Sequence, residues 1–216
     1  MAHILVVGAS HGVGLETVKA ALAAGHKVRA LARTANDIAI ETSNLEKVAG
    51  DATDTHTLRD ALPGIEVVIM TIGVSPGAST VMSGTRLFST ATRALIDAMK
   101  AAGARRLVVV TGIGAGDSRG HGGAFYDWFF FPLVLKRIYD DKDVQERMVR
   151  DSGLDWTIVR PGLLTNGPRT GRYRALIDPV AWRADSISRA DVADFLVEEA
   201  TSRSYLRQTP VVISQR

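Results

Sequence analysis

Short apolar segments rich in valine, isoleucine and leucine recur along the chain, and polar residues rarely interrupt them. Strands that are covered on both faces of a sheet have this pattern, because neither face needs polar side chains. A sheet of this kind requires helices on both of its faces. The segments predict strands at residues 4–8, 27–31, 67–73, 106–112, 156–162 and 210–214.

Between these segments, apolar residues recur at the spacing of amphipathic helices. Helices are expected at residues 16–24, 58–62, 85–102, 140–152 and 189–200, and three of them stop at Gly25, Gly103 and Gly153. Strands and helices alternate, which favours parallel strands joined by right-handed crossovers. The expected fold class is α/β, with a doubly wound, mainly parallel sheet and helices on both faces. Irregular structure is expected at 112–127 and 162–182.

Length and composition indicate a single domain spanning residues 1–216. The chain has 216 residues, 46% of them hydrophobic, which suffices for one substantial core. Lys and Arg total 26 against 23 for Asp and Glu, and so small and scattered an excess does not predict a nucleic-acid partner. Cysteine is absent, which excludes disulfides and thiolate chemistry and is compatible with a reducing compartment.

The sequence contains no segment typical of a membrane span, a secretion signal or a metal site. The longest apolar run, residues 128–135, is far shorter than the ~18 residues that cross a bilayer. The residues before Gly8 are apolar but have no basic leader. No histidine has metal-ligand spacing with another histidine or a carboxylate. We therefore expect a cytoplasmic protein with no transmembrane segment and no metal.

The connection between the first predicted strand and the first helix reads GASHGVG, residues 8–14. In a doubly wound sheet this turn directs backbone N–H groups and a helix dipole toward the carboxyl edge, where they favour a phosphate. Gly8 can form the tight turn, Gly12 leaves room for a pyrophosphate, and Gly14 lets the helix pack closely on the strand. A tight turn without a ligand is the alternative, but the position between strand and helix favours a dinucleotide.

Several segments, taken in order, resemble a known family: GASHGVG (8–14), VAGDATD (48–54), VVIMTIG (67–73), RLVVVTGIGAG (106–116), SGLDWTIVRPG (152–162) and ISRADVADFLVEE (187–199). The chain resembles the short-chain dehydrogenase/reductase superfamily, and more specifically its atypical branch of biliverdin-IXβ/flavin reductase-like and NmrA-like NAD(P)-binding proteins. The resemblance implies a Rossmann-type fold. It also implies a cofactor site made of Gly8, Ser10, His11, Gly12, Val13, Gly14, Arg33, Asp51, Ala52, Thr71, Ile72, Gly73, Thr111, Lys142, Pro161 and Gly162.

The residues after the second predicted strand bear on which dinucleotide is bound. NAD sites usually place a carboxylate there for the ribose hydroxyls, whereas the 2′-phosphate of NADP calls for a cation. Arg33 stands at this position and His11 precedes the second glycine, so NADP(H) is favoured over NAD(H). A solvated Arg33 is the alternative, with Asp37 as a late competitor for the ribose. Asp51 matches the family's adenine-contacting aspartate, or else caps the helix that starts near Asp54.

Reductases of this superfamily commonly use Ser, Tyr and Lys: a hydroxyl orients the carbonyl, a phenol delivers the proton, and a lysine holds the nicotinamide ribose. Thr111 stands at the serine position. In place of Y-x-x-x-K, Tyr139 and Lys142 are one residue closer but still share a helix face. NmrA-like relatives have a lone lysine about fourteen residues before an aromatic, as Lys142 precedes Trp156. The alternative is an exposed Lys142 paired with Glu146.

Two stretches are expected to face the acceptor. The arginine-rich residues 163–175 include Arg172 and could favour an anionic acceptor such as FMN, although solvated arginines are the commoner explanation. Residues 122–139 are rich in aromatics, and Tyr126 and Trp128 are candidates for a wall on which a planar ring stacks. This aromatic run could also form a dimer face or a membrane-surface contact.

The sequence thus predicts an NADP(H)-dependent oxidoreductase that transfers hydride from the nicotinamide to a small planar acceptor, a flavin or quinone first and another planar carbonyl compound next. Small C-terminal elements at about 162–185 are expected on the substrate side, a homodimer is compatible, and His121 is a further candidate acid. Biliverdin-reductase-like members carry a histidine near the position of Glu146, so tetrapyrrole reduction is disfavoured. The alternative function is a non-catalytic NADP-binding redox sensor or assembly or regulatory protein of the NmrA-like type, which the missing Y-x-x-x-K supports.

Overall fold

The computed structural model describes residues 1–74, 85–121 and 136–215. At its centre is an eight-stranded sheet with the order β3-β2-β1-β4-β5-β6-β10-β8. These strands are β1 (His3–Val7), β2 (Lys27–Ala32), β3 (Leu45–Ala49), β4 (Val67–Met70), β5 (Arg106–Val110), β6 (Asp155–Pro161), β8 (Tyr173–Leu176) and β10 (Val211–Ser214). Neighbouring strands are parallel except β10 and β8. The order of the first six strands is that of a doubly wound Rossmann-type sheet.

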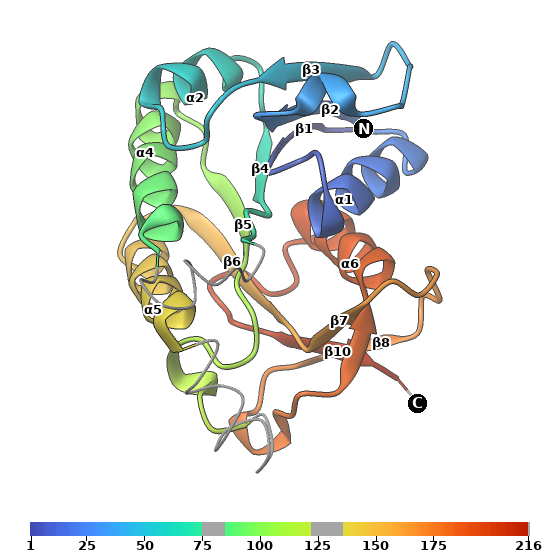
Figure 1. Ribbon diagram of the computed structural model, residues 1–216, viewed down its shortest axis with the longest axis vertical. Helices are drawn as coiled ribbons and strands as arrows, with labels where there is room; N and C mark the ends of the chain where they lie inside the picture. The colour runs from blue at the N-terminus through green and yellow to red at the C-terminus, as the bar shows by residue number, and fades with distance from the viewer. Residues whose placement is uncertain (75–84, 122–135, 216) are drawn as a thin grey trace.

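Helices cover both faces of this sheet (Figure 1). One face carries α1 (Gly12–Ala23) and α6 (Arg189–Ser202), which pack against each other. The other face carries α2 (Thr55–Ala61), α4 (Leu87–Ala102) and α5 (Lys136–Arg150). Short elements complete the described chain: η1 (Ala35–Asp37), η2 (Gly116–Ser118), η4 (Pro179–Ala181), and β7 (Leu163–Thr165) paired in parallel with β9 (Ser186–Ser188). Of the described helices, none combines the length and apolarity needed to cross a membrane.

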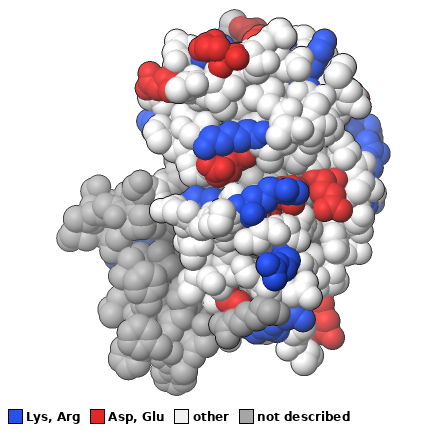
Figure 2. All heavy atoms as spheres, turned by 90° about the vertical axis from the view of Figure 1, so that its right-hand side faces the viewer, with Lys and Arg blue, Asp and Glu red and all other residues white. Residues whose placement is uncertain are grey.

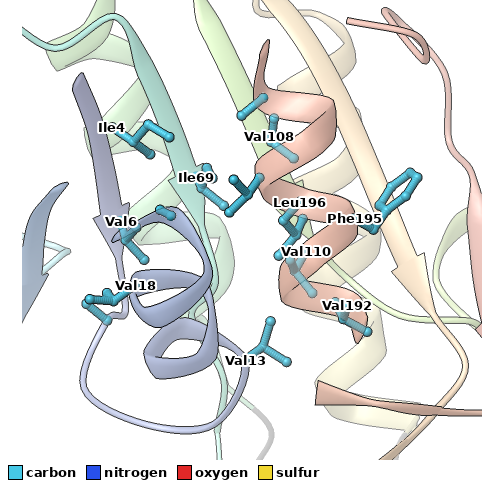
Figure 3. Packing of buried hydrophobic residues seen from close by; sticks show 14 of the residues in the cluster. Ile4, Val6, Val13, Val18, Ile69, Val108, Val110, Val192, Phe195 and Leu196 are labelled. Carbon is cyan, nitrogen blue, oxygen red and sulfur yellow. The ribbon is translucent and has the colours of Figure 1, made fainter. Parts of the chain in front are cut away.

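The first strand shows why the apolar segments are uninterrupted. Ile4 and Val6 join the cluster under α1 and α6 (Figure 3), whereas Leu5 and Val7 join the cluster under α2, α4 and α5. All four side chains are fully buried. Burying one such side chain contributes roughly 1.5–3 kcal/mol. Burial on both faces of the sheet therefore stabilises the fold.

The predicted strands are confirmed as β1, β2, β4, β5, β6 and β10, and each predicted helix is present with ends that differ by a few residues. The apolar pattern does not predict β3, β7, β8 and β9. The first three consist of half-buried or exposed residues, and β9 has one apolar residue between two serines. The expectation of an irregular stretch at 162–182 is wrong in part, since it contains β7 and β8.

Candidate functional site

The glycine turn is tight on its inner side and open at one point. A Cβ on Gly14 would lie 2.0 Å from the carbonyl oxygen of Gly8 and 2.7 Å from Oγ1 of Thr71, so no side chain fits where α1 rests on β1. Gly8 has a φ of +90°, which residues with a side chain rarely adopt. At Gly12, by contrast, only the Arg189 side chain comes within 4 Å of a Cβ position among the described residues. The turn can therefore be approached at Gly12.

The first turn of α1 presents backbone N–H groups toward this opening. His11 precedes the helix in an extended conformation, and no described side chain caps the helix. The Nδ1 atom of His11 lies 2.8 Å from Oγ of Ser10, while Val13 is buried in the core beneath the helix (Figure 3). Uncapped N–H groups at the positive end of a helix dipole attract an anion. The turn is thus suited to a phosphate.

The ends of β2, β3 and β4 hold the residues predicted to bind the adenosine. They are Arg33 after β2, Asp51 and Ala52 after β3, and Thr71, Ile72 and Gly73 after β4. Asp51 accepts hydrogen bonds from N and Oγ1 of Thr53, both at 2.8 Å, and these bonds, aided by the charge of the exposed Arg33, hold the pKa of Asp51 below its usual range. The residue that caps α2 is Asp54, so the interpretation of Asp51 as a helix cap is wrong.

The three predicted catalytic residues come together at the carboxyl end of β5. Nζ of Lys142 donates a hydrogen bond to the carbonyl oxygen of Thr111 at 2.8 Å and lies 4.4 Å from the ring centroid of Phe88. The hydroxyl of Tyr139 lies 2.7 Å from the point where a Cβ on Gly112 would stand. Tyr139 and Lys142 share one face of α5, three residues apart, so both side chains meet the residues that follow β5.

Lys142 is a buried side chain, with 8% of its surface exposed. The interpretation of Lys142 as an exposed surface residue is therefore wrong. Burial lowers its pKa to about 8, although the carboxylates of Glu146 and Asp141 act in the opposite direction. Desolvation disfavours the charged amine, and a buried lysine can in this way change protonation near physiological pH.

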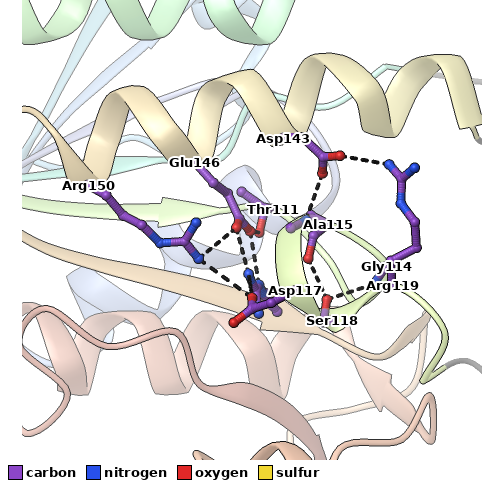
Figure 4. Close-up of polar contacts among 11 residues, drawn as sticks. Thr111, Gly114, Ala115, Asp117, Ser118, Arg119, Asp143, Glu146 and Arg150 are labelled. Carbon is purple, nitrogen blue, oxygen red and sulfur yellow. Dashed lines mark hydrogen bonds and ion pairs between the residues drawn. The ribbon is translucent and has the colours of Figure 1, made fainter.

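A buried carboxylate links α5 to the ends of β5 and β6 (Figure 4). Glu146 accepts hydrogen bonds from Oγ1 of Thr111 at 2.8 Å, from Nε and Nη2 of Arg160 at 3.0 and 2.6 Å, and from Nη2 of Arg150 at 3.1 Å. Arg160 also donates to Oδ1 of Asp117. Burial opposes the charge of Arg160, but these two carboxylates outweigh it and raise the pKa of the guanidinium. The hydroxyl hydrogen of Thr111 is therefore directed at Glu146.

The loop after β5 covers this network. Its Gly116 N–H donates to Oδ1 of Asp143 at 2.7 Å, which ties the loop to α5. The Arg160 guanidinium lies 5.3 Å from the ring of Trp182, and His121 packs edge-on against the same ring at 5.4 Å. Sequence reasoning missed the network, since it considered Arg160 only for backbone contacts. The sequence signal that could have indicated this network is Glu146, a carboxylate one helical turn after Lys142.

The turn after β6 is shaped by close backbone approach. The carbonyl oxygen of Pro161 accepts a hydrogen bond from N of Ile113 at 3.1 Å. A Cβ on Gly162 would lie 2.0 Å from the carbonyl oxygen of Asp185. Only glycine fits at this point, and the turn therefore offers backbone rather than side-chain groups to the site.

The predicted acceptor residues are only partly within the described chain. Tyr126 and Trp128, like the rest of the aromatic run, lie outside the described residues. Arg172 is exposed and precedes β8, whose first residue pairs with the last residue of β10 at the carboxyl edge of the sheet. The adjoining loop is held by Asp191, which accepts hydrogen bonds from N and Oγ1 of Thr170 at 2.7 and 2.8 Å. Among the described residues, no three His, Asp or Glu side chains are placed to share a metal ion.

The strand order and the glycine turn define the class as a Rossmann-type domain that binds a dinucleotide. The model of the NAD(P)H-binding family matches residues 8–203, and the chain belongs to this family. The predicted resemblance to NAD(P)-binding reductases is thereby confirmed at the level of the family.

The relatives include proteins named as reductases. The chain is 34% identical over 174 residues to sterol demethylase protein B of Methylococcus capsulatus, which covers 76% of this chain and 52% of that protein. It is 29% identical over 160 residues to the NAD(P)H azoreductase of Xenophilus azovorans, with 74% and 47% covered. The solved structure of ChuY, an anaerobilin reductase of Escherichia coli O157:H7, has a TM-score of 0.79 and 28% identity over 98% of this chain and 97% of that one. The chain spans about half the length of the two curated relatives.

Proposed function

We propose that this protein is an NADP(H)-dependent reductase of small planar acceptors, with flavins and quinones as the first candidates. The observation that carries the proposal is the buried Lys142, whose amino group lies at the carboxyl end of β5 next to Thr111, with Tyr139 on the same helix face. Lysines are almost never fully buried unless they are paired, and groups with strongly perturbed pKa values cluster at functional sites. The names of the azoreductase and the anaerobilin reductase agree with a reductase.

The described residues fit a dinucleotide. The uncapped turn at residues 8–14, open at Gly12, has the shape and charge that a pyrophosphate requires. We assign the 2′-phosphate to Arg33 and His11, the adenine to Asp51 and Ala52, its ribose to residues 71–73, and the nicotinamide to Pro161 and Gly162. Ser10 and Val13 would contribute their backbone N–H groups.

The chain's own side chains supply positioning and a proton. A bound reduced nicotinamide supplies the hydride. Lys142 would bind the nicotinamide ribose through Nζ, and its pKa of about 8 lets it relay a proton near neutral pH. Tyr139 is the candidate donor of that proton to the acceptor. Because the hydroxyl of Thr111 is engaged by Glu146, we assign Thr111 to holding α5 against β5 rather than to the acceptor.

We assign the acceptor side to residues about 162–185, and the sequence favours the same role for the aromatic run, which lies outside the described residues. Arg172 at the carboxyl edge would favour an acceptor with an anionic group, such as the phosphate of FMN. Hydride transfer to a flavin or quinone needs little beyond stacking and the exclusion of water, so it tolerates a sparse set of catalytic side chains.

The proposal is tested by following the absorbance of NADPH with FMN, riboflavin and quinones, in wild type, in Lys142→Met and in Lys100→Met. Lys100 is an exposed lysine in the last turn of α4 and serves as the matched control. Turnover should fall by about 100-fold or more in Lys142→Met, the range for a lost proton-transfer group. Binding of NADPH, measured separately by fluorescence, should persist, because most of the nucleotide is held elsewhere.

Two outcomes would contradict the proposal. Equal turnover by Lys142→Met and wild type would show that Lys142 takes no part in the reaction. Binding of NADPH without oxidation by any acceptor would favour the non-catalytic sensor or assembly protein instead.

A further inference from the structure

The first residue of α6 lies beside the opening in the glycine turn. Nε of Arg189 is 3.8 Å from the point where a Cβ on Gly12 would stand, and no other described side chain comes as close to that point. α1 and α6 pack against each other on one face of the sheet, and both begin at its carboxyl edge (Figures 1 and 3). Arg189 therefore borders the entrance to the first turn of α1 from the neighbouring helix.

The charge of Arg189 has no carboxylate counterpart within the part of the chain that the structure describes. A cation in the first turn of a helix is disfavoured by the helix dipole. Among the described residues, no carboxylate pairs with Arg189, and its hydrogen bond goes to the neutral Oδ1 of Asn166, at 2.7 Å from Nη1. The acidic residue in the same turn, Asp191, has its carboxylate engaged by the backbone of Thr170 and Gly171.

Two other arginines of the same region are neutralised. Arg169 pairs with Asp194 at 2.8 Å and Arg183 pairs with Asp185 at 2.7 Å. On the molecular face that carries α1 and α6, the basic and acidic side chains drawn are interspersed (Figure 2). A half-buried arginine that is fixed by an amide and lacks a carboxylate is suited to an anion from outside the protein.

We propose that Arg189 binds the pyrophosphate of the dinucleotide, facing the N-terminus of α1 across Gly12. The inference rests on the proposed function, because it requires that a dinucleotide occupies the turn. Asn166 holds one end of the guanidinium and leaves the other N–H groups for phosphate oxygens. Anion binding at this turn thus combines the uncapped N-terminus of α1 with one fixed cation.

Comparing two nucleotides tests this assignment. The pyrophosphate is common to NADPH and NADH, whereas the 2′-phosphate is present only in NADPH. Arg189→Met should weaken the binding of both nucleotides by the same factor, about 10- to 100-fold, the range for a lost charge-assisted hydrogen bond. Arg33→Met should weaken the binding of NADPH alone. Dissociation constants are measured by titration at one fixed salt concentration.

Three further variants complete the experiment. Arg105→Met removes an arginine that already has a carboxylate partner, Asp155, at the amino edge of the sheet, and should bind both nucleotides like wild type. Arg189→Lys should bind both nucleotides more weakly than wild type but better than Arg189→Met. Lysine keeps the positive charge but lacks the planar guanidinium that binds phosphate through two N–H groups. Asn166→Ala should weaken both nucleotides to a smaller extent. Thermal unfolding without nucleotide should be nearly unchanged in Arg189→Met, because the residue is half-buried and makes one hydrogen bond.

The outcomes separate the inference from the proposed function. If wild type binds neither NADPH nor NADH, the dinucleotide proposal itself fails. If wild type binds both and Arg189→Met binds them equally well, only the role of Arg189 is overturned. A loss confined to NADPH in Arg189→Met would move the arginine to the 2′-phosphate and would also overturn the assignment to the pyrophosphate.

Discussion

Two buried arginine–glutamate pairs lie at opposite edges of the sheet. At the amino end of β5, Nη2 of Arg106 lies 2.7 Å from Oε1 of Glu199. At the carboxyl end of β6, Nη2 of Arg160 lies 2.6 Å from Oε2 of Glu146. All four side chains are at most 1% exposed. The two pairs have the same chemistry and nearly the same geometry, yet their surroundings differ.

The pair at the amino edge is closed. Arg106 donates to the carbonyl oxygens of Asp155 and Glu199 and to Oγ1 of Thr157, all of which are neutral. Burial there dominates and lowers the pKa of Arg106, with Glu199 only partly offsetting it. Glu199 receives its remaining hydrogen bonds from Thr157, Tyr205 and Ser202. This pair therefore ties α6 to β5 and β6. None of its hydrogen-bond partners among the described residues belongs to the candidate functional site.

The pair at the carboxyl edge is open and extended. Arg160 has a second carboxylate in Asp117, whose side chain is 65% exposed, and the two acids together raise the pKa of Arg160. Glu146 also accepts the hydrogen bond of the Thr111 hydroxyl. Its charge partly offsets the effect of burial, which lowers the pKa of Lys142. A buried ion pair of this kind therefore bears on function only through the other residues that its side chains contact.

The largest effect is expected from Glu199→Gln. Removing one partner leaves the Arg106 charge buried without a counter-charge, which costs about 3–5 kcal/mol of unfolding free energy. Urea unfolding measures the loss, and the affinity of the folded protein for NADPH should be unchanged. In a double variant, Arg106→Met/Glu199→Met, much of the stability should return, because no isolated charge is left. A loss of unfolding free energy below about 1 kcal/mol in Glu199→Gln would contradict the argument that Arg106 is left buried without a counter-charge.

Glu146→Gln should cost less stability, about 2 kcal/mol, because Arg160 keeps the partly hydrated Asp117 as its partner. It should also change the chemistry. Since Glu146 raises the pKa of Lys142, the variant should lower that pKa further below about 8. The basic limb of the pH profile of turnover should then move to lower pH. An unmoved profile would separate Glu146 from Lys142 and reduce the network to a structural tie.

A smaller effect concerns the pH dependence of stability at Lys142. Its pKa is about 8 in the folded chain against an ordinary value of 10.5. Between these values the unfolded chain binds the proton that the folded chain has released, so the free energy of unfolding contributed by this lysine rises with pH. The penalty is complete below about pH 8 and is relieved as the pH rises toward 10.5. From pH 7 to pH 9 the gain is about 1 kcal/mol.

The measurement compares wild type with Lys142→Met, because other titrating groups are common to both. The free energy of unfolding of wild type, relative to that of Lys142→Met, should rise by about 1 kcal/mol from pH 7 to pH 9. The exposed control Lys100→Met should show no such shift. A constant difference across this range would mean that Lys142 keeps its ordinary pKa in the folded protein.

Much of the architecture could be predicted from the sequence, because apolar periodicity reports burial directly. The strands with two covered faces were identifiable, whereas the half-exposed β3 and β8 were not, since their polar residues interrupt the pattern. The spacing of Tyr139 and Lys142 indicated a shared helix face. It could not tell whether that face looks toward solvent or toward β5, and on this depends the pKa of Lys142.

The sequence by itself determined the alternation of strands and helices, the glycine turn and the candidate lysine, because these depend on local spacing and on which backbone conformations glycine allows. Only the tertiary structure decided that Lys142 is buried, that Glu146 joins Arg160 and Thr111, and that Arg189 faces Gly12. These contacts join residues far apart in the chain, or sides of a helix that no periodicity orients. Their energies depend on desolvation, which exists only once the elements have packed.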